Sequence, residues 1–355
     1  MTVVRYNSPE RGMNFVRYVQ ALALAKDNPL GAFEVAASRW GSDSAPARIC
    51  KAVVEGATLI PGNWGSDLFQ QEAAAFFGVV AEQTIPGRLI GLGRVPLNVR
   101  LLTGNTPATA YWRGSGQPAP LTAMAYGEQA LKPLEVSALA VVTEELARST
   151  DPAAEGMIRA ELIRAASQAI DNAFLDPTNA GVANAKPASI TYGATELNNP
   201  TSDPAEALAL LFRMFNGDWR FAHLIMEPDV AGRIALFRDP SGCMPYVADL
   251  GPKGGTLAGV PVLTTREFAE DSTGATIALV DASGIAYGDA GAAVKVSSQA
   301  TIEMLTDPTN DSGTGTATEQ VSLFQTNAVA TLIQRQVNWK RARSNAVVVL
   351  TGANF

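Results

Sequence analysis

The residue types that perform most protein catalysis are scarce in this chain. His223 is the only histidine among the 355 residues, and it lies within the apolar run Phe221–Ile225. A catalytic triad or a zinc site would have to be built on this one side chain. Because neither metal-ligand spacing nor a nucleophile elbow accompanies it, we interpret His223 as a structural residue of a buried strand.

Three glycine-rich segments approach known motifs without matching them. Gly114-Ser115-Gly116 lacks the outer glycines of a nucleophile elbow. Gly91-Leu92-Gly93 is followed by Pro96, where a dinucleotide-binding fingerprint needs its third glycine. The run Gly251–Thr256 does not have the spacing of a phosphate-binding loop, and we interpret it as a flexible glycine loop.

Paired carboxylates and cysteines add no further candidate. Glu144 and Glu145 are adjacent, so on a helix they point in different directions. Cys50 and Cys243 are the only cysteines and lie far apart in sequence, which favours neither a disulfide framework nor a metal cluster. The sequence therefore predicts a protein that is not an enzyme and that has no catalytic residue, cofactor or metal.

The composition points to interactions between copies of the chain. Charged residues make up 17% of the sequence, below the typical quarter, and the net charge is −7. We interpret the deficit as surface buried between subunits, with a surface rich in Ala, Gly and Thr as the alternative. The negative charge argues against a nucleic-acid-binding protein. We find neither an apolar run of membrane-spanning length nor a signal-peptide core in MTVVRYNSPERG, and a reducing cytoplasm fits.

The stretch from Lys132 to Asn179 contains the clearest elements. Loose alternation from Leu134 to Val142 predicts a half-buried strand, and a short helical turn is expected over 143–148. Asp151-Pro152 is a strong helix start signal and predicts a helix over 152–176. Its predicted apolar face is Ile158, Leu162, Ala165, Ala166, Ala169, Ile170 and Ala173; its predicted polar face is Glu161, Arg164, Gln168, Asp171 and Asn172.

The segments before this stretch are short. Helices are expected over 12–26, 32–40, 45–54 and 66–83, followed by an extended segment over 85–99. The first three, separated by Pro, Gly and Ser, make a poor independent core, so residues 1–60 are expected to form an arm that packs on the body or reaches a neighbour.

Residues 100–131 predict an extended two-stranded ribbon with its tip at 114–120. A structureless loop of this length is improbable in a compact domain, and an isolated ribbon is marginal in water. We therefore expect the ribbon to lie on another subunit. The residues expected to make intersubunit contacts are Tyr111, Trp112, Arg113, Gln117 and Glu128.

The second half of the chain alternates between helices and strands. Helices are expected over 204–216 and 229–237 and strands over 221–226, 260–263, 277–280, 294–305, 321–338 and 346–350. Near the C-terminus Arg335, Lys340, Arg341 and Arg343 surround Trp339. They predict an intersubunit or DNA-facing charge cluster, with a solvated strand end as an equally weighted alternative.

Together these segments resemble the major capsid protein family of tailed bacteriophages, which has the Hong Kong 97-like fold. The resemblance covers residues 56–350 and rests on the order and spacing of several segments. These are the extended loop ending in Leu131-Lys132-Pro133, the block VVTEELARSTDPAAEGMIRAELIRAASQAIDNAFLD, the stretch LAGVPVLTT, and VSLFQTNAVATLIQRQVNW followed by a hydrophobic strand.

The resemblance implies an α+β fold with four parts. Residues 1–60 would form the N-terminal arm, and 100–131 the extended β-hairpin loop. Residues 61–99, 132–179 and 301–340 would form the peripheral domain, with the spine helix at 152–176. Residues 180–300 and 341–355 would form an α/β axial domain.

The same resemblance implies a structural protein that assembles into the pentamers and hexamers of an icosahedral shell around double-stranded DNA. Scaffolding, portal and decoration proteins are possible partners, the DNA is contacted weakly, and no membrane is involved. The shell would form in the host bacterial cytoplasm and become the virion capsid. Some relatives link subunits through a lysine in the extended loop, but no lysine occurs between Lys51 and Lys132, so we expect a non-covalent shell. The nearer alternative is an encapsulin-type nanocompartment that encloses cargo enzymes, and the more distant one is a soluble α/β enzyme with an atypical site.

Overall fold

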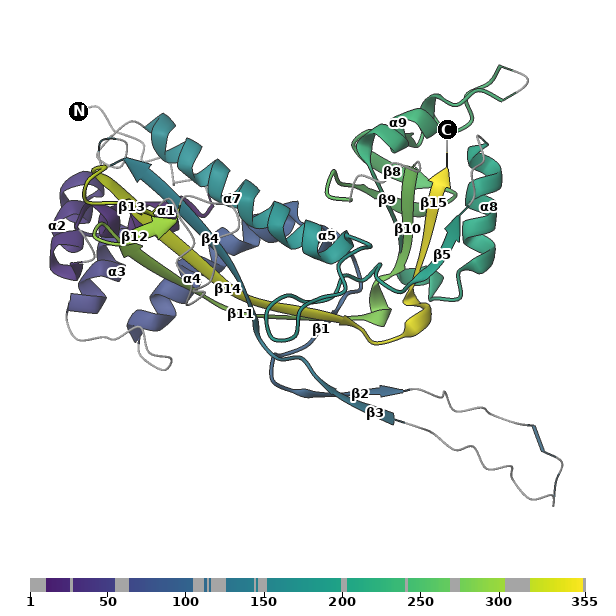
Figure 1. The fold of residues 1–355 in the computed structure, drawn as a ribbon, viewed down its shortest axis with the longest axis horizontal. Helices are drawn as coiled ribbons and strands as arrows, with labels where there is room; N and C mark the ends of the chain where they lie inside the picture. The colour runs from purple at the N-terminus through teal and green to yellow at the C-terminus, as the bar shows by residue number, and fades with distance from the viewer. Residues whose placement is uncertain are drawn as a thin grey trace. The chain divides into compact units, whose positions relative to one another are not determined.

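The computed structural model describes residues 11–25, 28–54, 64–104, 112–113, 115, 126–143, 145, 152–198, 203–239, 242–268, 275–303 and 320–353. The chain divides into two compact units. Unit 1 comprises residues 1–82, 136–167 and 291–335, and unit 2 comprises residues 83–135, 168–290 and 336–355. Figure 1 labels their helices and strands.

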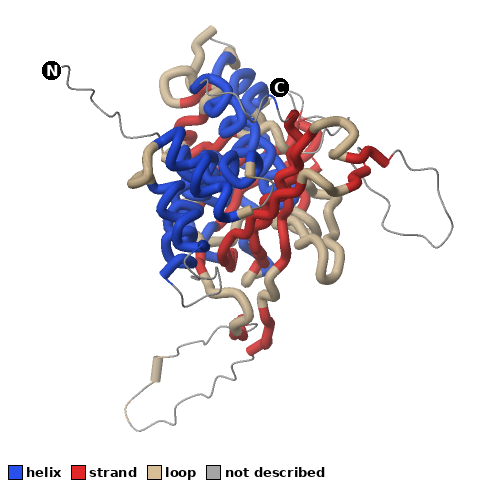
Figure 2. The backbone as a smooth tube through the Cα atoms, turned by 90° about the vertical axis from the view of Figure 1, so that its left-hand side faces the viewer, coloured by secondary structure: helices blue, strands red, loops and turns tan. Residues whose placement is uncertain are grey.

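Unit 1 begins with a group of helices, and aromatic side chains of the first and the last of them pack together. They are α1 (Met13–Leu24), α2 (Pro29–Trp40), α3 (Ala45–Val54) and α4 (Trp64–Gln83), drawn as blue tubes in Figure 2. Phe15 of α1 stacks on Phe76 of α4 with ring centroids 4.8 Å apart, and both rings are almost fully buried. Asn28 caps α2 by accepting a hydrogen bond from the Leu30 amide at 3.1 Å. The helices predicted from periodicity are therefore confirmed.

The long helix α7 (Pro152–Leu175) begins at the predicted proline, but the prediction of its buried face is partly wrong. Ala165 and Ala169 are exposed, whereas Asp171, predicted to lie on the polar face, is buried. The prediction counted these alanines as part of the apolar face, although alanine is also common on exposed helix surfaces. The residues that are buried therefore follow a different stripe along the helix from the predicted one. Its central members are Leu162, Ile163, Ser167, Ile170, Ala173 and Phe174.

A four-stranded sheet has the order β1-β11-β14-β4. Its strands are β1 (Gly93–Arg94), β11 (Ile285–Ser297), β14 (Ala328–Arg341) and β4 (Leu134–Thr143). The strands expected over 294–305 and 321–338 are each divided, because β12 (Thr301–Glu303) and β13 (Gln320–Ser322) form a separate antiparallel pair. Asn327, with φ of +49°, makes the turn before β14.

Unit 2 is built around a mixed seven-stranded sheet of order β5-β15-β10-β6-β9-β8-β7. The strands are β5 (Thr195–Asn198), β15 (Val347–Ala353), β10 (Ala275–Asp281), β6 (Ala222–Met226), β9 (Val260–Thr264), β8 (Gly254–Leu257) and β7 (Leu250–Gly251). Helices α8 (Pro204–Met214) and α9 (Pro228–Leu236) share one hydrophobic core with β6, β10 and β15. All five residues of β6 are buried, as expected for an interior strand.

Two predictions in unit 2 are wrong. The segment 251–255 is not a flexible loop, because β7 and β8 pair as an antiparallel hairpin there. The segment after α4 is not wholly extended, because Ile85–Arg88 forms the short helix α5. The carboxylate of Asp171 accepts a hydrogen bond from the Ile85 amide at 2.8 Å, which satisfies a donor at the start of that helix.

The predicted ribbon is present at its base. Strands β2 (Arg100–Gly104) and β3 (Tyr126–Ala130) form a two-stranded antiparallel sheet, with Arg100 opposite Ala130 and Gly104 opposite Tyr126. Most of the short helix expected over 143–148 lies outside the described residues. Among the described helices, none combines the length and apolar character needed to span a bilayer.

Candidate functional site

His223 has the structural role expected of it. Its ring is almost fully buried in β6; its Nδ1 lies 3.0 Å from the Phe221 carbonyl oxygen, and its Nε2 accepts a hydrogen bond from the Ile90 amide at 3.3 Å. Burial lowers the pKa of the imidazole, which favours the neutral ring. Within the described part of the chain, no three side chains of His, Cys, Asp or Glu are grouped to hold a metal ion.

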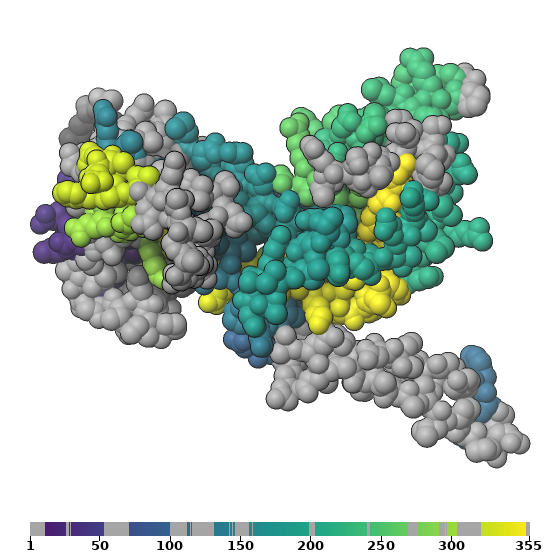
Figure 3. Space-filling view, viewed as in Figure 1, coloured from purple at the N-terminus to yellow at the C-terminus, as the bar shows by residue number. Residues whose placement is uncertain are grey.

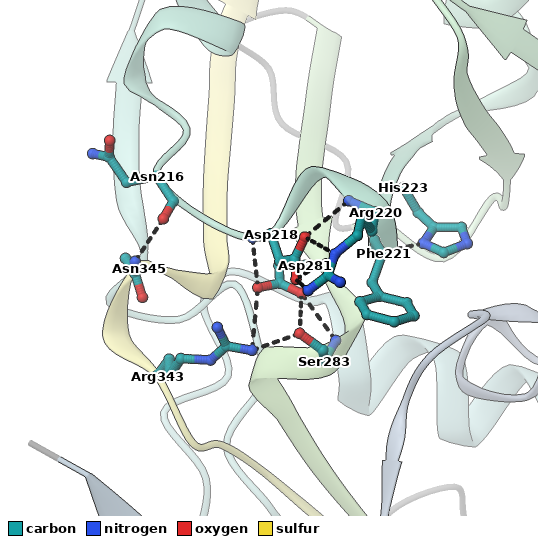
Figure 4. A network of polar contacts seen from close by, with 9 residues as sticks. All are labelled: Asn216, Asp218, Arg220, Phe221, His223, Asp281, Ser283, Arg343 and Asn345. Atoms are coloured by element: carbon teal, nitrogen blue, oxygen red, sulfur yellow. Dashed lines mark hydrogen bonds and ion pairs between the residues drawn. The ribbon is translucent and has the colours of Figure 1, made fainter. Parts of the chain in front are cut away.

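A polar network in unit 2 is centred on Asp281, as Figure 4 shows. Asp281 is completely buried at the end of β10. Its Oδ1 accepts hydrogen bonds from the Ser283 amide at 3.0 Å and hydroxyl at 2.7 Å, and its Oδ2 accepts one from the Asp218 amide at 3.0 Å. Arg343 Nη2 lies 3.5 Å from the same Oδ2 and donates to Ser283 Oγ at 2.5 Å.

Two further contacts extend this network. The Asp218 carboxylate is paired with the Arg220 guanidinium at 2.6 Å, and this hydrogen bonding lowers the pKa of Asp218 to about 2. Asn345 Nδ2 donates to the Asn216 carbonyl oxygen at 2.8 Å. The network therefore joins the turn before β6, the turn after β10 and the connection between β14 and β15. The polar groups of the network bond to one another, so we interpret the network as one that holds these three segments together and not as a catalytic site.

Sequence reasoning missed the role of Asp281. The signal is the pattern Asp281-Ala282-Ser283 at the end of an apolar strand, in which an aspartate bonds the amide two residues on. The partners Asp218 and Arg343 are distant in sequence, so only the fold reveals them.

The five residues predicted for ribbon contacts are only partly described. Trp112 is fully exposed, and Arg113 beside it is exposed as well. Glu128 belongs to β3, opposite Leu102 of β2. Tyr111 and Gln117 lie outside the described residues. A fully exposed tryptophan is a typical anchor for a partner protein, since its large apolar area is buried on binding.

The four predicted cations do not form one cluster. Arg335 is buried in β14, with its guanidinium 4.7 Å from the centroid of the Phe77 ring in unit 1. Arg341 donates to the carbonyl oxygens of Tyr192 and Gly193 at 2.7 and 3.2 Å, and Arg343 belongs to the Asp281 network. Lys340 is exposed at the end of the same strand.

Comparisons with known proteins bear on this fold directly. Residues 92–352 match the family described as the phage capsid family. The chain is 34% identical over 371 residues to the capsid polyprotein of Pseudomonas phage PAJU2. That match covers 98% of the chain and 54% of the relative, so the chain spans about half the length of this curated relative.

Solved structures give the same result for the fold. The structure from Gordonia phage Cozz matches with a TM-score of 0.54 and 17% identity, covering 77% of this chain and 87% of that one. The capsid of a native GTA particle matches with a TM-score of 0.54 and 14% identity, covering 78% and 91%. The structure from Mycobacterium phage Adephagia matches with a TM-score of 0.53 and 15% identity, covering 78% and 90%.

Proposed function

Because this chain belongs to the phage capsid family and has the Hong Kong 97-like fold, we propose that it is a major capsid protein. Its copies assemble into pentamers and hexamers that form an icosahedral shell around double-stranded DNA. Its role is structural and not enzymatic. The observation that carries the proposal is the family match over residues 92–352 together with the 34% identity to a phage capsid polyprotein.

Two features of the chain support assembly. The β2–β3 ribbon pairs within itself and presents Trp112 fully to solvent. The low charged fraction of 17% fits a molecule that buries much of its surface against neighbours. The encapsulin-type alternative is not favoured, because the family matched is the phage capsid family and the curated relative is a phage capsid polyprotein.

The parts of the subunit have corresponding roles in this proposal. Residues 1–60 act as the arm, 100–131 as the extended loop, and 61–99, 132–179 and 301–340 as the peripheral domain. Residues 180–300 and 341–355 form the axial domain around the symmetry axes. Scaffolding, portal and decoration proteins are further partners, assembly takes place in the bacterial cytoplasm, and the product is the virion capsid.

The ribbon contacts a neighbouring subunit through Tyr111, Trp112, Arg113, Gln117 and Glu128. Trp112→Ala removes the largest exposed side chain of that set and should reduce the yield of particles without unfolding the subunit. Phe324→Ala, at an exposed aromatic side chain of unit 1, is the matched control. Equal particle yields from Trp112→Ala and the unchanged chain would contradict the ribbon contact.

Electron microscopy and size-exclusion chromatography of the purified chain test the assembly itself. We expect megadalton icosahedral particles, and their nucleic-acid content distinguishes a DNA-filled shell from a compartment for protein cargo. Boiling the particles in detergent should release monomers, because the segment between Lys51 and Lys132 contains no lysine for a covalent link. A protein that elutes only as a ~37 kDa monomer would refute the proposed function.

A further inference from the structure

A cavity of about 560 Å³ lies in unit 2 where three segments distant in sequence meet. The segments are residues 131–134 after the ribbon, residues 180–192 after α7, and the end of β14 at 338–341. On the face shown in Figure 3, the teal segment that follows α7 lies next to the yellow segment at the end of β14. The cavity borders the base of the ribbon without including its tip.

Side chains of β14 hold the walls in place. Asn338 Nδ2 donates to the Lys132 carbonyl oxygen at 2.6 Å, and Trp339 Nε1 donates to the Ala188 carbonyl oxygen at 2.9 Å. Trp339 is also packed edge-on against Phe174, with ring centroids 5.3 Å apart. Since each segment is anchored to the same strand, the cavity is a preformed feature of the fold.

The lining of the cavity is strongly cationic. It includes Lys132, Lys186, Lys340 and Arg341, and it includes no aspartate or glutamate. The three lysines are exposed, and none of them forms an ion pair with any residue that the structure describes. Four cations around one cavity repel one another, so an anion placed among them would be stabilised.

Arg341 supplies a second, independent observation. One terminal nitrogen of its guanidinium donates to two backbone carbonyl oxygens, but the other, Nη1, is buried and has no hydrogen-bond partner among the described residues. Burial lowers the pKa of this guanidinium, because it removes part of the hydration of the charged form. A buried donor of this kind is costly unless an acceptor reaches it.

We propose that the cavity is a receptor for a carboxylate-bearing segment of a second copy of this chain. The volume suits one or two inserted side chains, whereas a DNA duplex is too wide to enter and could present its phosphates only at the rim. The net charge of −7 also favours contact with an acidic protein segment over contact with nucleic acid. The inference rests on the proposed function, because assembly is what brings a second copy to the cavity.

A zero-length carbodiimide cross-linker tests this contact in assembled particles. The reagent activates a carboxylate, and attack by a lysine Nζ in contact with it forms an amide, releasing the reagent as its urea. Particles assembled from a mixture of ¹⁴N- and ¹⁵N-labelled chains distinguish links between copies from links within one copy. We expect mass spectrometry to find Lys132, Lys186 or Lys340 joined to an Asp or Glu of a differently labelled copy. Particles that show such links at other lysines and none at these three would overturn the proposal.

Charge reversal at the two lysines outside β14 gives a second measurement. The double variant Lys132→Glu and Lys186→Glu should fold, as judged by circular dichroism, and should bind fluorescent hexaglutamate roughly tenfold more weakly than the unchanged chain. Lys253→Glu, which makes the same kind of charge change in the exposed hairpin turn between β7 and β8, should bind as the unchanged chain does.

The outcomes separate this inference from the proposed function. Hexaglutamate binding that is insensitive to the double variant would refute the receptor while leaving shell assembly intact. A loss of binding to a short DNA duplex in the double variant, with hexaglutamate unaffected, would make phosphate the occupant and overturn the proposal. If the unchanged chain forms no particles, the proposed function fails, and hexaglutamate binding by the unassembled chain still decides whether the cavity takes carboxylates.

Discussion

The carboxyl group of Asp171 makes the free energy of unfolding depend on pH in a direction opposite to that of most carboxylates. Asp171 is 5% exposed on α7, and burial raises its pKa to about 7 from 3.8. The amide of Ile85 and the positive charge of Arg88 lower that pKa, while the negative charge of Glu267 raises it. Burial outweighs the stabilising contacts, so the folded chain favours the protonated form.

The sign follows from proton binding. Between about pH 4 and about pH 7 the folded chain holds a proton on Asp171 that the unfolded chain has released, so the free energy of unfolding falls as the pH rises. A shift of about 3 units corresponds to about 4 kcal/mol when the window has been crossed. The penalty is about 3 kcal/mol near pH 6 and about 4 kcal/mol near pH 8.5, a difference of about 1.4 kcal/mol.

Asp171→Asn removes the titration and retains an oxygen that can accept from the Ile85 amide. Urea unfolding of the unassembled chain, followed by tryptophan fluorescence, should show the variant gaining about 1.4 kcal/mol in free energy of unfolding relative to the unchanged chain between pH 6 and pH 8.5. Both values lie above the isoelectric point of about 5.0, where solubility is lowest. Glu267→Gln should make the pH dependence of the unchanged chain smaller, because it removes a neighbouring negative charge.

A difference between Asp171→Asn and the unchanged chain that stays constant over this range would refute the reasoning. It would mean that the carboxyl group is hydrated in the folded chain and titrates as it does when unfolded.

Three other predictions follow from packing and exposure. Trp339→Phe should lower the free energy of unfolding by about 1 kcal/mol in urea titration, because the Ala188 carbonyl oxygen loses the hydrogen bond from the indole N–H. Gly255→Ala should lower it by at least about 2 kcal/mol, because a Cβ there would lie 2.1 Å from a backbone oxygen at φ of +149°, whereas Gly251→Ala meets nothing within 4 Å. Iodoacetamide should label exposed Cys243 in the folded chain but not Cys50, whose pKa burial raises to about 12; peptide mapping that finds both labelled before unfolding would contradict this.

Much of the fold could be predicted from local signals. Asp151-Pro152 correctly predicted the start of α7, and the largely apolar run at Phe221–Met226 correctly predicted an interior strand. Such signals depend only on residues that are close in sequence, so they can be recognised without knowledge of the tertiary structure. The Hong Kong 97-like fold, inferred from the order of these segments, is confirmed by the family match and the solved structures.

The details that failed depend on contacts between distant residues. Asp171 was placed on the polar face because an aspartate on a long helix is usually solvated, and its burial depends on Ile85 and its neighbours. The four predicted cations do not form one cluster, because Arg335 lies over the Phe77 ring and Arg343 belongs to the Asp281 network. The cationic cavity could not be predicted, since its walls come from segments around 132, 186 and 340.

Strand β15 has a consequence for the order in which unit 2 forms during synthesis. This last described strand lies between β10 and β5, and in the described sheet β5 is joined to the other strands only through it. A ribosome-bound chain that has not yet released Val347–Ala353 therefore has neither strand in place, although β5 was synthesised about 150 residues earlier. Completion of this sheet therefore waits until the ribosome has released β15.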